Sequence, residues 1–351
     1  MPLTAISSVK FSGVASAVPR KKVLLSEYPF MDDTAKTRFS KRTGIKEARI
    51  GSSDLTASDM CFASAKKLLE NLKWVPDEIE ALVFVSQSQD YPLPATACIL
   101  QNRLGLPKTS LAFDISLGCS GYIYGLATVS SLISAMKIKK ALLLVGENTL
   151  MQHIPENTHS YPLFGDAGTA TALEYDKFAP DMYFELNTDG TGFESIIRKH
   201  GGVRHPITSD SFVLRDIGDG AKARDVDCVI DGAAIMEFTI NEVPPTVKRI
   251  LDYSKTDIST VDGFYFHQGN KMINETIRKI CKIPAEKTHY SIDKFANTSC
   301  ASIPLTMTVC SSDELTSTKA VNFLCAFGVG LSWGGAIIRT DNIVCPNLIE
   351  L

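Results

Sequence analysis

Segments with the apolar pattern of buried strands alternate with segments of helical periodicity through the first half of this chain. Residues 57–72 carry Met60, Leu68 and Leu69 at helical spacing, and the apolar run 81–86 has the length of a strand. This alternation predicts βαβ units in a largely parallel sheet with helices on both faces. The predicted strands are 9–18, 81–86, 111–115 and 140–146, and the predicted helices are 26–41 (in pieces), 57–72, 95–104 and 120–136. Residues 164–173 are predicted as a Gly-rich turn that enters a strand, which Thr169 and Thr171 favour over a helix.

The same order of elements begins again after a connection at 187–219, which is rich in Gly, Asp, Arg and His and is predicted to cross the surface. A predicted helix at 235–253 contains Pro244 and Pro245, which are expected to kink it or divide it in two. The later elements are predicted as a strand at 263–267, a helix at 271–282, an extended piece at 291–295, a helix at 299–310, and strands at 320–327 and 331–339. The sequence therefore predicts an α/β protein with two repeated halves, 1–175 and 176–351, packed into one body.

The composition excludes several classes of protein. With a net charge of −3 and 21% charged residues, the chain has no basic field or basic-aromatic runs for nucleic acid. The nine cysteines are an odd number without a Cys-x-x-Cys pair, which favours reduced thiols over disulfides or zinc and predicts a cytoplasmic protein without a metal. No signal peptide is evident at the N-terminus, and the longest apolar runs are far below the roughly 20 residues that span a bilayer.

Cys119 lies where the strand predicted at 111–115 gives way to a helix that begins near Ser120. The unpaired N–H groups of a helix start carry partial positive charge, so a thiol placed there is expected to ionise more easily. Gly118 and Gly121 leave room for a substrate carbonyl, and the same N–H groups can hold an oxyanion. The alternative is that Cys119 is a small core residue.

His267 and Asn297 are two further candidates. His267 ends an apolar strand at the edge where α/β sheets place their ligands, and Asn297 precedes a helix. Each also has a structural interpretation: His267 as a hydrogen-bonded core histidine, and Asn297 as a helix N-cap.

The segments around these three residues resemble the β-ketoacyl-(acyl carrier protein) synthase III family of the thiolase superfamily. They read DISLGCSG around Cys119, FHQGN around His267, ANTSCASIP around Asn297 and FGVGLSWGG around Gly330. The resemblance extends through RTGI at 42–45, FGDAG at 164–168, GGVR at 201–204 and DG at 231–232, and so covers nearly the whole chain in order. It implies a thiolase-like fold in which two βαβαβ halves form a layered α-β-α-β-α body.

The resemblance also implies a mechanism. Cys119 would be acylated by a thioester, with the backbone N–H groups of Cys119 and Gly330 as the oxyanion hole. His267 and Asn297 would donate hydrogen bonds to a malonyl thioester, stabilise the enolate left by carbon dioxide, and allow a Claisen condensation to a 3-ketoacyl product. Coenzyme A or phosphopantetheine thioesters would be substrates, with no cofactor bound permanently. An acyl carrier protein and a second copy of the chain would be the partners.

Further residues are assigned by the same resemblance. Arg42, Leu93, Phe164, Phe238 and Asn270 are expected to bind or enclose the substrate. Leu93 stands where the family often has a larger aromatic side chain that closes the partner's acyl tunnel, so a longer or differently shaped acyl group is expected.

Some positions depart from the family pattern. Arg38 replaces a Trp that stacks on the coenzyme A adenine, Thr158 and His159 stand near a lost arginine, and Val329 replaces a glycine. These departures point to a specialised acyl substrate, and to a carrier protein as its donor.

A basic patch for an acidic carrier protein is a further, weaker candidate. It comprises Lys271, Arg278, Lys279 and Lys282 on the helix predicted after His267, where Arg278 and Lys282 are four residues apart and therefore expected on one face. A solvated helix face is the alternative.

Other functions stay open at this point. A papain-like protease also uses Cys, His and Asn in this order, but its local motif around the nucleophile is absent. A scaffold subunit of a synthase is disfavoured because all three residues are present. Acyl transfer to a non-malonyl acceptor is compatible with the same three residues.

Overall fold

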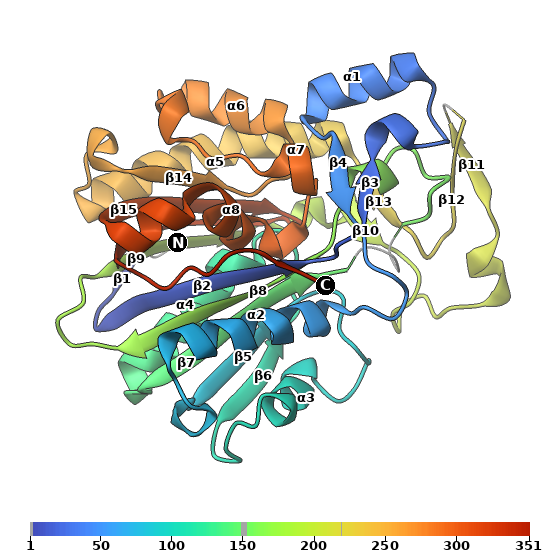
Figure 1. Cartoon of the computed structure of the whole chain (residues 1–351). Helices are drawn as coiled ribbons and strands as arrows, with labels where there is room; N and C mark the ends of the chain where they lie inside the picture. Colours follow the sequence, from blue (N-terminus) through green and yellow to red (C-terminus); the bar gives the residue numbers. More distant parts are fainter. Residues whose placement is uncertain (1–2, 149–152, 219) are drawn as a thin grey trace.

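The computed structural model describes residues 3–148, 153–218 and 220–351. Its frame is two large sheets that lie one above the other (Figure 1). The first sheet has six strands in the order β17-β2-β8-β7-β5-β6. Their bounds are β17 (Ile349–Glu350), β2 (Val9–Val18), β8 (Ala167–Tyr175), β7 (Lys140–Glu147), β5 (Ala81–Val85) and β6 (Leu111–Ile115).

The second sheet has five strands in the order β1-β9-β16-β15-β14. Their bounds are β1 (Thr4–Ile6), β9 (Met182–Thr188), β16 (Ser332–Asp341), β15 (Lys319–Gly328) and β14 (Gly263–Phe266). Three small ribbons pair β3 (Lys22–Leu24) with β4 (Glu47–Arg49), β10 (Ile196–Arg198) with β13 (Cys228–Ile230), and β11 (Arg215–Gly218) with β12 (Ala221–Ala223).

Helices form the other three layers. The helix α4 (Gly121–Met136) and the helix α8 (Ser302–Ser317) lie between the two sheets and contact both. The outer face of the first sheet is covered by α2 (Ala57–Leu72) and α3 (Thr96–Arg103), and that of the second sheet by α5 (Gly232–Ser254) with α6 (Lys271–Ile280) beside it. The predicted α-β-α-β-α order is therefore confirmed.

The central strands of the first sheet are buried on both faces. In β5 and β7, Leu82 and Leu142 face α2, whereas Val83 and Leu143 face α4. Strands covered on both faces read as continuous apolar runs, which is the pattern of these segments. None of the helices in the described ranges has the length and apolar character needed to cross a bilayer.

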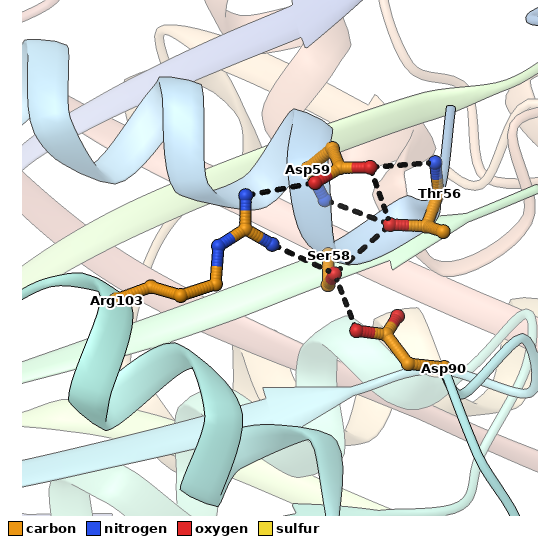
Figure 2. A network of polar contacts seen from close by, with 5 residues as sticks. All are labelled: Thr56, Ser58, Asp59, Asp90 and Arg103. Carbon is orange, nitrogen blue, oxygen red and sulfur yellow. Dashed lines mark hydrogen bonds and ion pairs between the residues drawn. The ribbon is translucent and has the colours of Figure 1, made fainter. Parts of the chain in front are cut away.

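A polar network fixes the start of α2 against α3 and the loop before it (Figure 2). Thr56 and Asp59 form a capping box at the start of α2, and Arg103 of α3 donates to Asp59 Oδ1 at 2.7 Å. The Ser58 hydroxyl donates to Asp90 Oδ2 at 2.8 Å. The base of the loop that carries Leu93 is therefore held in place.

The predicted division of the helix at 235–253 is wrong, because α5 runs without interruption through Pro244 and Pro245. A proline inside a helix costs roughly 3 kcal/mol. Here Val243, Val247 and Ile250 are buried against the second sheet, and each such burial contributes about 1.5–3 kcal/mol. Packing therefore offsets the loss at the prolines.

Two other local predictions differ from the structure. Residues 291–295, predicted as extended, contain the one-turn helix α7 (Ile292–Phe295), whose two apolar ends are both buried. A segment this short has too little hydrophobic periodicity to distinguish a helix from an extended strand. The connection at 187–219 contains β10 and β11 in addition to loops, and its last residue, Asp219, lies outside the described residues.

The remaining short helix is α1 (Asp33–Thr43), which ends at Gly44 in the left-handed conformation.

Candidate active site

Cys119 lies in the turn between β6 and α4 and is partly exposed. The turn is tight, with the Gly121 N–H donating to the Gly118 carbonyl at 2.7 Å. Gly328, at the end of β15, lies against it so closely that an added Cβ would sit 2.7 Å from the Cys119 sulfur. The turn that follows β6 of the first sheet therefore places the Cys119 thiol against the end of β15 in the second sheet.

Burial raises the pKa of the Cys119 thiol. The nearby Val329 backbone N–H and Ser299 side chain act to lower this pKa, while the charge of Glu147 raises it further. The expectation of an easily ionised thiol is therefore wrong for the free protein, because desolvation outweighs the helix start. The thiol needs a proton acceptor when it attacks.

His267 directly follows β14 and is buried, and its Nδ1 lies 2.9 Å from the Ser302 hydroxyl. That hydroxyl accepts the Gln268 N–H at 3.2 Å, so its own hydrogen can point to Nδ1. We therefore assign the remaining ring proton to Nε2. Burial lowers the pKa of His267 to about 4, which makes it a neutral hydrogen-bond donor at physiological pH.

Asn297 lies between α7 and the short 3₁₀ helix Ser299–Ala301. Its Oδ1 accepts the Ser299 N–H at 2.8 Å, which sets the orientation of the amide. Its backbone N–H donates to Leu163 at 2.9 Å, and its carbonyl accepts from Gly165 at 3.1 Å. None of the hydrogen bonds within the described residues uses Nδ2, so the amide can donate to a substrate oxygen.

Ser299 brings the three residues together. Its N–H donates to Asn297 Oδ1 at 2.8 Å, its carbonyl acts to raise the pKa of His267, and its side chain acts to lower the pKa of Cys119. Its φ of 49° and the φ of 54° at Ala296 lie in the left-handed region, which is strained for non-glycine residues and is often found at functional sites. The three candidates, 30 to 178 residues apart in the sequence, thus form one site.

Two of the predicted substrate residues also lie close to this site. Phe164 forms a β-bridge with Asn297, and its ring stacks on His153 with 4.5 Å between centroids. Phe238, in the first turns of α5, packs edge-on against Trp333 at 5.2 Å. Gly330 follows Val329 in the turn that touches Cys119.

The other predicted residues lie elsewhere. Arg42 and Arg38 are exposed on α1, and Leu93 is 82% exposed. Asn270 caps α6 by accepting the Met272 N–H at 2.8 Å, so its side chain has a structural use. Near the position where the resemblance implies a lost arginine, Thr158 is buried and His159 is exposed.

The proposed basic face on α6 is wrong in its geometry. The helix ends at Ile280, so Lys282 lies beyond it and does not share a face with Arg278. Arg278 forms an ion pair with Glu275 at 2.9 Å, which neutralises its charge. Lys271, Lys279 and Lys282 are exposed.

Sequence reasoning missed four residues that shape the site, namely Ser299, Ser302, Glu147 and His153. Ser299 and Ser302 are part of the motif around Asn297, but their partners come from other segments. Glu147 ends the apolar strand β7, and a carboxyl group in that position was a signal that could have been noticed.

The description "3-Oxoacyl-[acyl-carrier-protein (ACP)] synthase III" belongs to a family model that matches residues 113–190, and the C-terminal model of the same family matches 251–340. A Campylobacter jejuni protein that carries the name 3-oxoacyl-[acyl-carrier-protein] synthase 3 is 33% identical over 99% of this chain and 98% of its own length. The chain belongs to the 3-oxoacyl-(acyl-carrier-protein) synthase III family. A β-ketoacyl-[acyl-carrier-protein] synthase III of Desulfitobacterium hafniense is 29% identical to this synthase over 95% of the chain and 98% of the relative.

A solved structure agrees with this assignment. The 3-oxoacyl-(acyl-carrier protein) synthase from Burkholderia xenovorans LB400 superposes on this synthase with a TM-score of 0.93, at 36% identity, over 100% of this chain and 99% of that one. The synthase therefore has the thiolase-like fold expected from its motifs, and it is an acyltransferase of the carbon–carbon bond-forming kind.

Proposed function

We propose that an acyl thioester loads Cys119 of this synthase, and that the acyl group then condenses with a malonyl thioester on an acyl carrier protein to give a 3-ketoacyl product. The observation that carries the proposal is that the end of β15 lies against both Cys119 and His267, through Gly328 and Phe327, while Asn297 is fixed beside Ser299. A nucleophile and two neutral donors in one place suit both half-reactions. Carbon dioxide and the free thiol of the acyl donor are the other products.

In the first half-reaction, the Cys119 sulfur attacks the thioester carbonyl. The backbone N–H groups of Cys119 and Gly330 are proposed to hold the oxyanion that forms. Support comes from the turn at Gly328 and Val329, which contacts the thiol directly. A thioester oxygen that becomes negatively charged beside the thiol would therefore lie close to backbone N–H groups from both halves of the chain.

In the second half-reaction, His267 Nε2 and Asn297 Nδ2 are proposed to donate to the malonyl thioester oxygen. Two neutral donors stabilise the enolate left by decarboxylation without supplying a proton to its carbon. The carbanion then attacks the acyl-Cys119 carbonyl and displaces the thiolate. The depressed pKa of His267 supports this role, since the ring stays neutral.

The acyl group is proposed to be specialised and carried by a protein. Phe164 and Phe238 would shape its binding site, and Arg42 would meet the phosphate-bearing arm of the donor. Lys271, which is exposed and lies against Gly44 at the end of α1, would face an acidic carrier protein. The missing Trp at Arg38 supports a donor other than coenzyme A, because no adenine platform stands there.

We further propose a homodimer in the cytoplasm. The strand β6 is an edge of its sheet, and Leu111 N–H bonds inward to Glu80, so Ala112 and Asp114 direct their backbone groups outward. An open edge can pair with a second copy, and the exposed Leu93 would then reach the partner. All nine cysteines are free thiols, which fits a reducing compartment. The halves 1–175 and 176–351 would supply the nucleophile and the two donors, respectively.

The experiment that tests the covalent step is intact-protein mass spectrometry. The enzyme is incubated with acyl-coenzyme A and acyl-carrier-protein thioesters of increasing chain length, without a malonyl donor. We expect a stable mass gain that maps to Cys119 and is absent in Cys119→Ala. A protein that iodoacetamide modifies at Cys119, but that no thioester acylates, would contradict the proposal.

The role of Asn297 is tested by separating the two half-reactions. We expect Asn297→Ala to reduce decarboxylation of malonyl-carrier protein by about 10- to 100-fold, because one donor to the enolate is lost. The mass gain at Cys119 should change far less. Equal losses in both half-reactions would contradict the proposed role.

A further inference from the structure

The side chain of Gln87 lies against the turn that carries the nucleophile. Gln87 comes shortly after β5, which runs parallel to β6, the strand that leads to Cys119. A Cβ added at Gly118, the residue before Cys119, would sit 3.2 Å from the Gln87 amide carbon Cδ and closer still to the amide oxygen Oε1. The Gln87 amide therefore rests on the backbone of this turn, with Oε1 as its nearest atom.

The turn after β15 reaches the same point from the second sheet. The Val329 Cγ1 atom would be 2.6 Å from a Cβ at Gly118, and Gly328 lies against the Cys119 sulfur. Gln87 and Val329 therefore both border the space in which Cys119 would receive an acyl group. Val329 contributes only methyl groups to this space, whereas Gln87 contributes a polar amide.

The backbone of Gln87 is held by both neighbours of β5. Its N–H donates to Glu147 Oε2 at 3.4 Å, and the hydroxyl of the next residue, Ser88, donates to Glu147 Oε1. Glu147 ends β7 and is buried, while on the other side the Ser86 N–H donates to the Ile115 carbonyl of β6 at 3.2 Å. These contacts fix the position of Gln87 without using its side chain.

The Gln87 amide is available to a substrate. The residue is exposed, and none of the hydrogen bonds among residues 3–148, 153–218 and 220–351 engages its side chain. An amide offers a carbonyl oxygen that accepts and an NH₂ group that donates. Because the atom nearest the Cys119 turn is Oε1, an acceptor, its complement on an acyl group is a hydrogen-bond donor. A hydroxyl is such a donor, whereas a hydrocarbon or a keto oxygen is not.

We propose that Gln87 selects acyl groups of the 3-hydroxyacyl class, by accepting a hydrogen bond from the acyl hydroxyl at Oε1. This inference rests on the proposed function of Cys119 as the nucleophile, and it names the feature that makes the acyl group specialised. A hydroxyl on C3 is separated from the thioester carbonyl by one carbon, so it can turn toward Gly118 while the N–H groups of Cys119 and Gly330 hold the carbonyl oxygen. Condensation with the malonyl unit would then give a 5-hydroxy-3-ketoacyl product.

The test compares the p-nitrophenyl esters of 3-hydroxybutanoic acid and 3-methylbutanoic acid, which have nearly the same shape but exchange a hydroxyl for a methyl group. The rate of mass gain on the Cys119 peptide is measured with each ester for the wild type, Gln87→Leu and Gln89→Leu. Gln89 is the matched control, because it is also exposed and lies two residues further along the same loop. Each ratio of rates is divided by the ratio for N-acetylcysteine, which removes the intrinsic reactivity of the esters.

The ratio is the informative quantity, since a change in folding or in thiol reactivity alters both rates together. For the wild type and Gln89→Leu, we expect the hydroxylated ester to be preferred about 5- to 10-fold, as for one hydrogen bond. We expect Gln87→Leu to lose that preference while its rate with the 3-methylbutanoyl ester does not fall.

Two results would overturn the proposal: a wild type that does not prefer the hydroxylated ester, or a preference that Gln87→Leu leaves unchanged. The esters need no carrier recognition, so neither result depends on the identity of the natural donor. A failure of the proposed function is recognised separately, because folded protein would then show no mass gain at Cys119 with either ester, and this inference would fall with it.

Discussion

The imidazole of His267 keeps its proton on Nε2 because Ser302 engages the other ring nitrogen. We expect Ser302→Ala to leave the tautomer undefined and to slow decarboxylation of malonyl thioester about 10-fold, as for the loss of one hydrogen bond of 1–1.5 kcal/mol. Acylation of Cys119 should change less than about two-fold. The measurement is carbon dioxide release by enzyme whose Cys119 is blocked with iodoacetamide.

The matched control for this prediction is Ser291→Ala. Ser291 is another buried serine near Gln268, but it bonds to Thr306 and not to His267. We expect its decarboxylation rate to stay at the wild-type level. If Ser302→Ala slowed acylation as much as decarboxylation, the hydroxyl would have only a structural role.

At the residue scale, the motifs around Cys119, His267 and Asn297 could be predicted from the sequence, because each is a local pattern of residue types. The contacts of Glu147 with Cys300 and of Phe164 with Asn297 could not, since each joins segments more than 130 residues apart. The direction of the Cys119 pKa was also missed. It depends on how deeply the turn is buried, which a helix-start argument does not contain.

Among the elements, the turn from α7 to Asn297 is the most constrained. The loop with Phe164 and Gly165 is bonded to both backbone groups of Asn297, and a Cβ added at Gly165 would sit 2.3 Å from the Phe295 carbonyl oxygen. We expect Gly165→Ala to shift this turn and to lower the free energy of unfolding by about 1–3 kcal/mol. Decarboxylation should fall further than acylation, because Asn297 loses its position.

Urea denaturation and the two half-reaction assays check this prediction. The control is Gly190→Ala, where an added Cβ meets nothing within 4 Å, so the free energy of unfolding should change by less than about 0.5 kcal/mol. If Gly165→Ala and Gly190→Ala had the same free energy of unfolding and the same half-reaction rates, the Asn297 turn would tolerate the added Cβ, and the prediction would be wrong.

The regular elements were predictable where periodicity was strong. The helix predicted at 57–72 matches α2, and the strand predicted at 9–18 matches β2. The one-turn helix α7 and the uninterrupted α5 were not predictable, because tertiary packing decides both. Local sequence sets the preference of an element, and burial against a sheet can override it.

For the whole molecule, the alternation of strands and helices predicted the α/β class and the layers. It could not predict that the three residues of β1 would pair with β9, or that β17 would pair with β2 at the opposite end of the chain. Such short strands carry almost no pattern of their own. They form because a large sheet offers them an edge.

The pH dependence of stability belongs to the whole molecule because several buried groups contribute with opposite signs. Burial lowers the pKa of both His153 and His267 to about 4, below the ordinary value of 6.5. Between these values the unfolded chain binds more protons than the folded protein, so this stability is present above pH 6.5 and is lost as the pH falls toward 4. Burial raises the pKa of Glu147 to about 7, so this group acts in the opposite direction over the same pH range. The pH dependence of the wild-type free energy of unfolding is therefore a sum of opposite contributions and does not isolate any one group.

A difference between variants isolates one histidine. We expect His153→Gln to be less stable than the wild type at pH 7.5, because the ring stacks on Phe164 and bonds to Ser160 at 2.9 Å. Between pH 6.5 and 5 that difference should shrink by about 1–2 kcal/mol, since each pH unit between the two pKa values is worth about 1.4 kcal/mol. The measurement is urea denaturation at several pH values, with His159→Gln as the exposed control. A His153→Gln difference that stays constant with pH would mean that His153 is protonated in the folded protein as readily as in the unfolded chain.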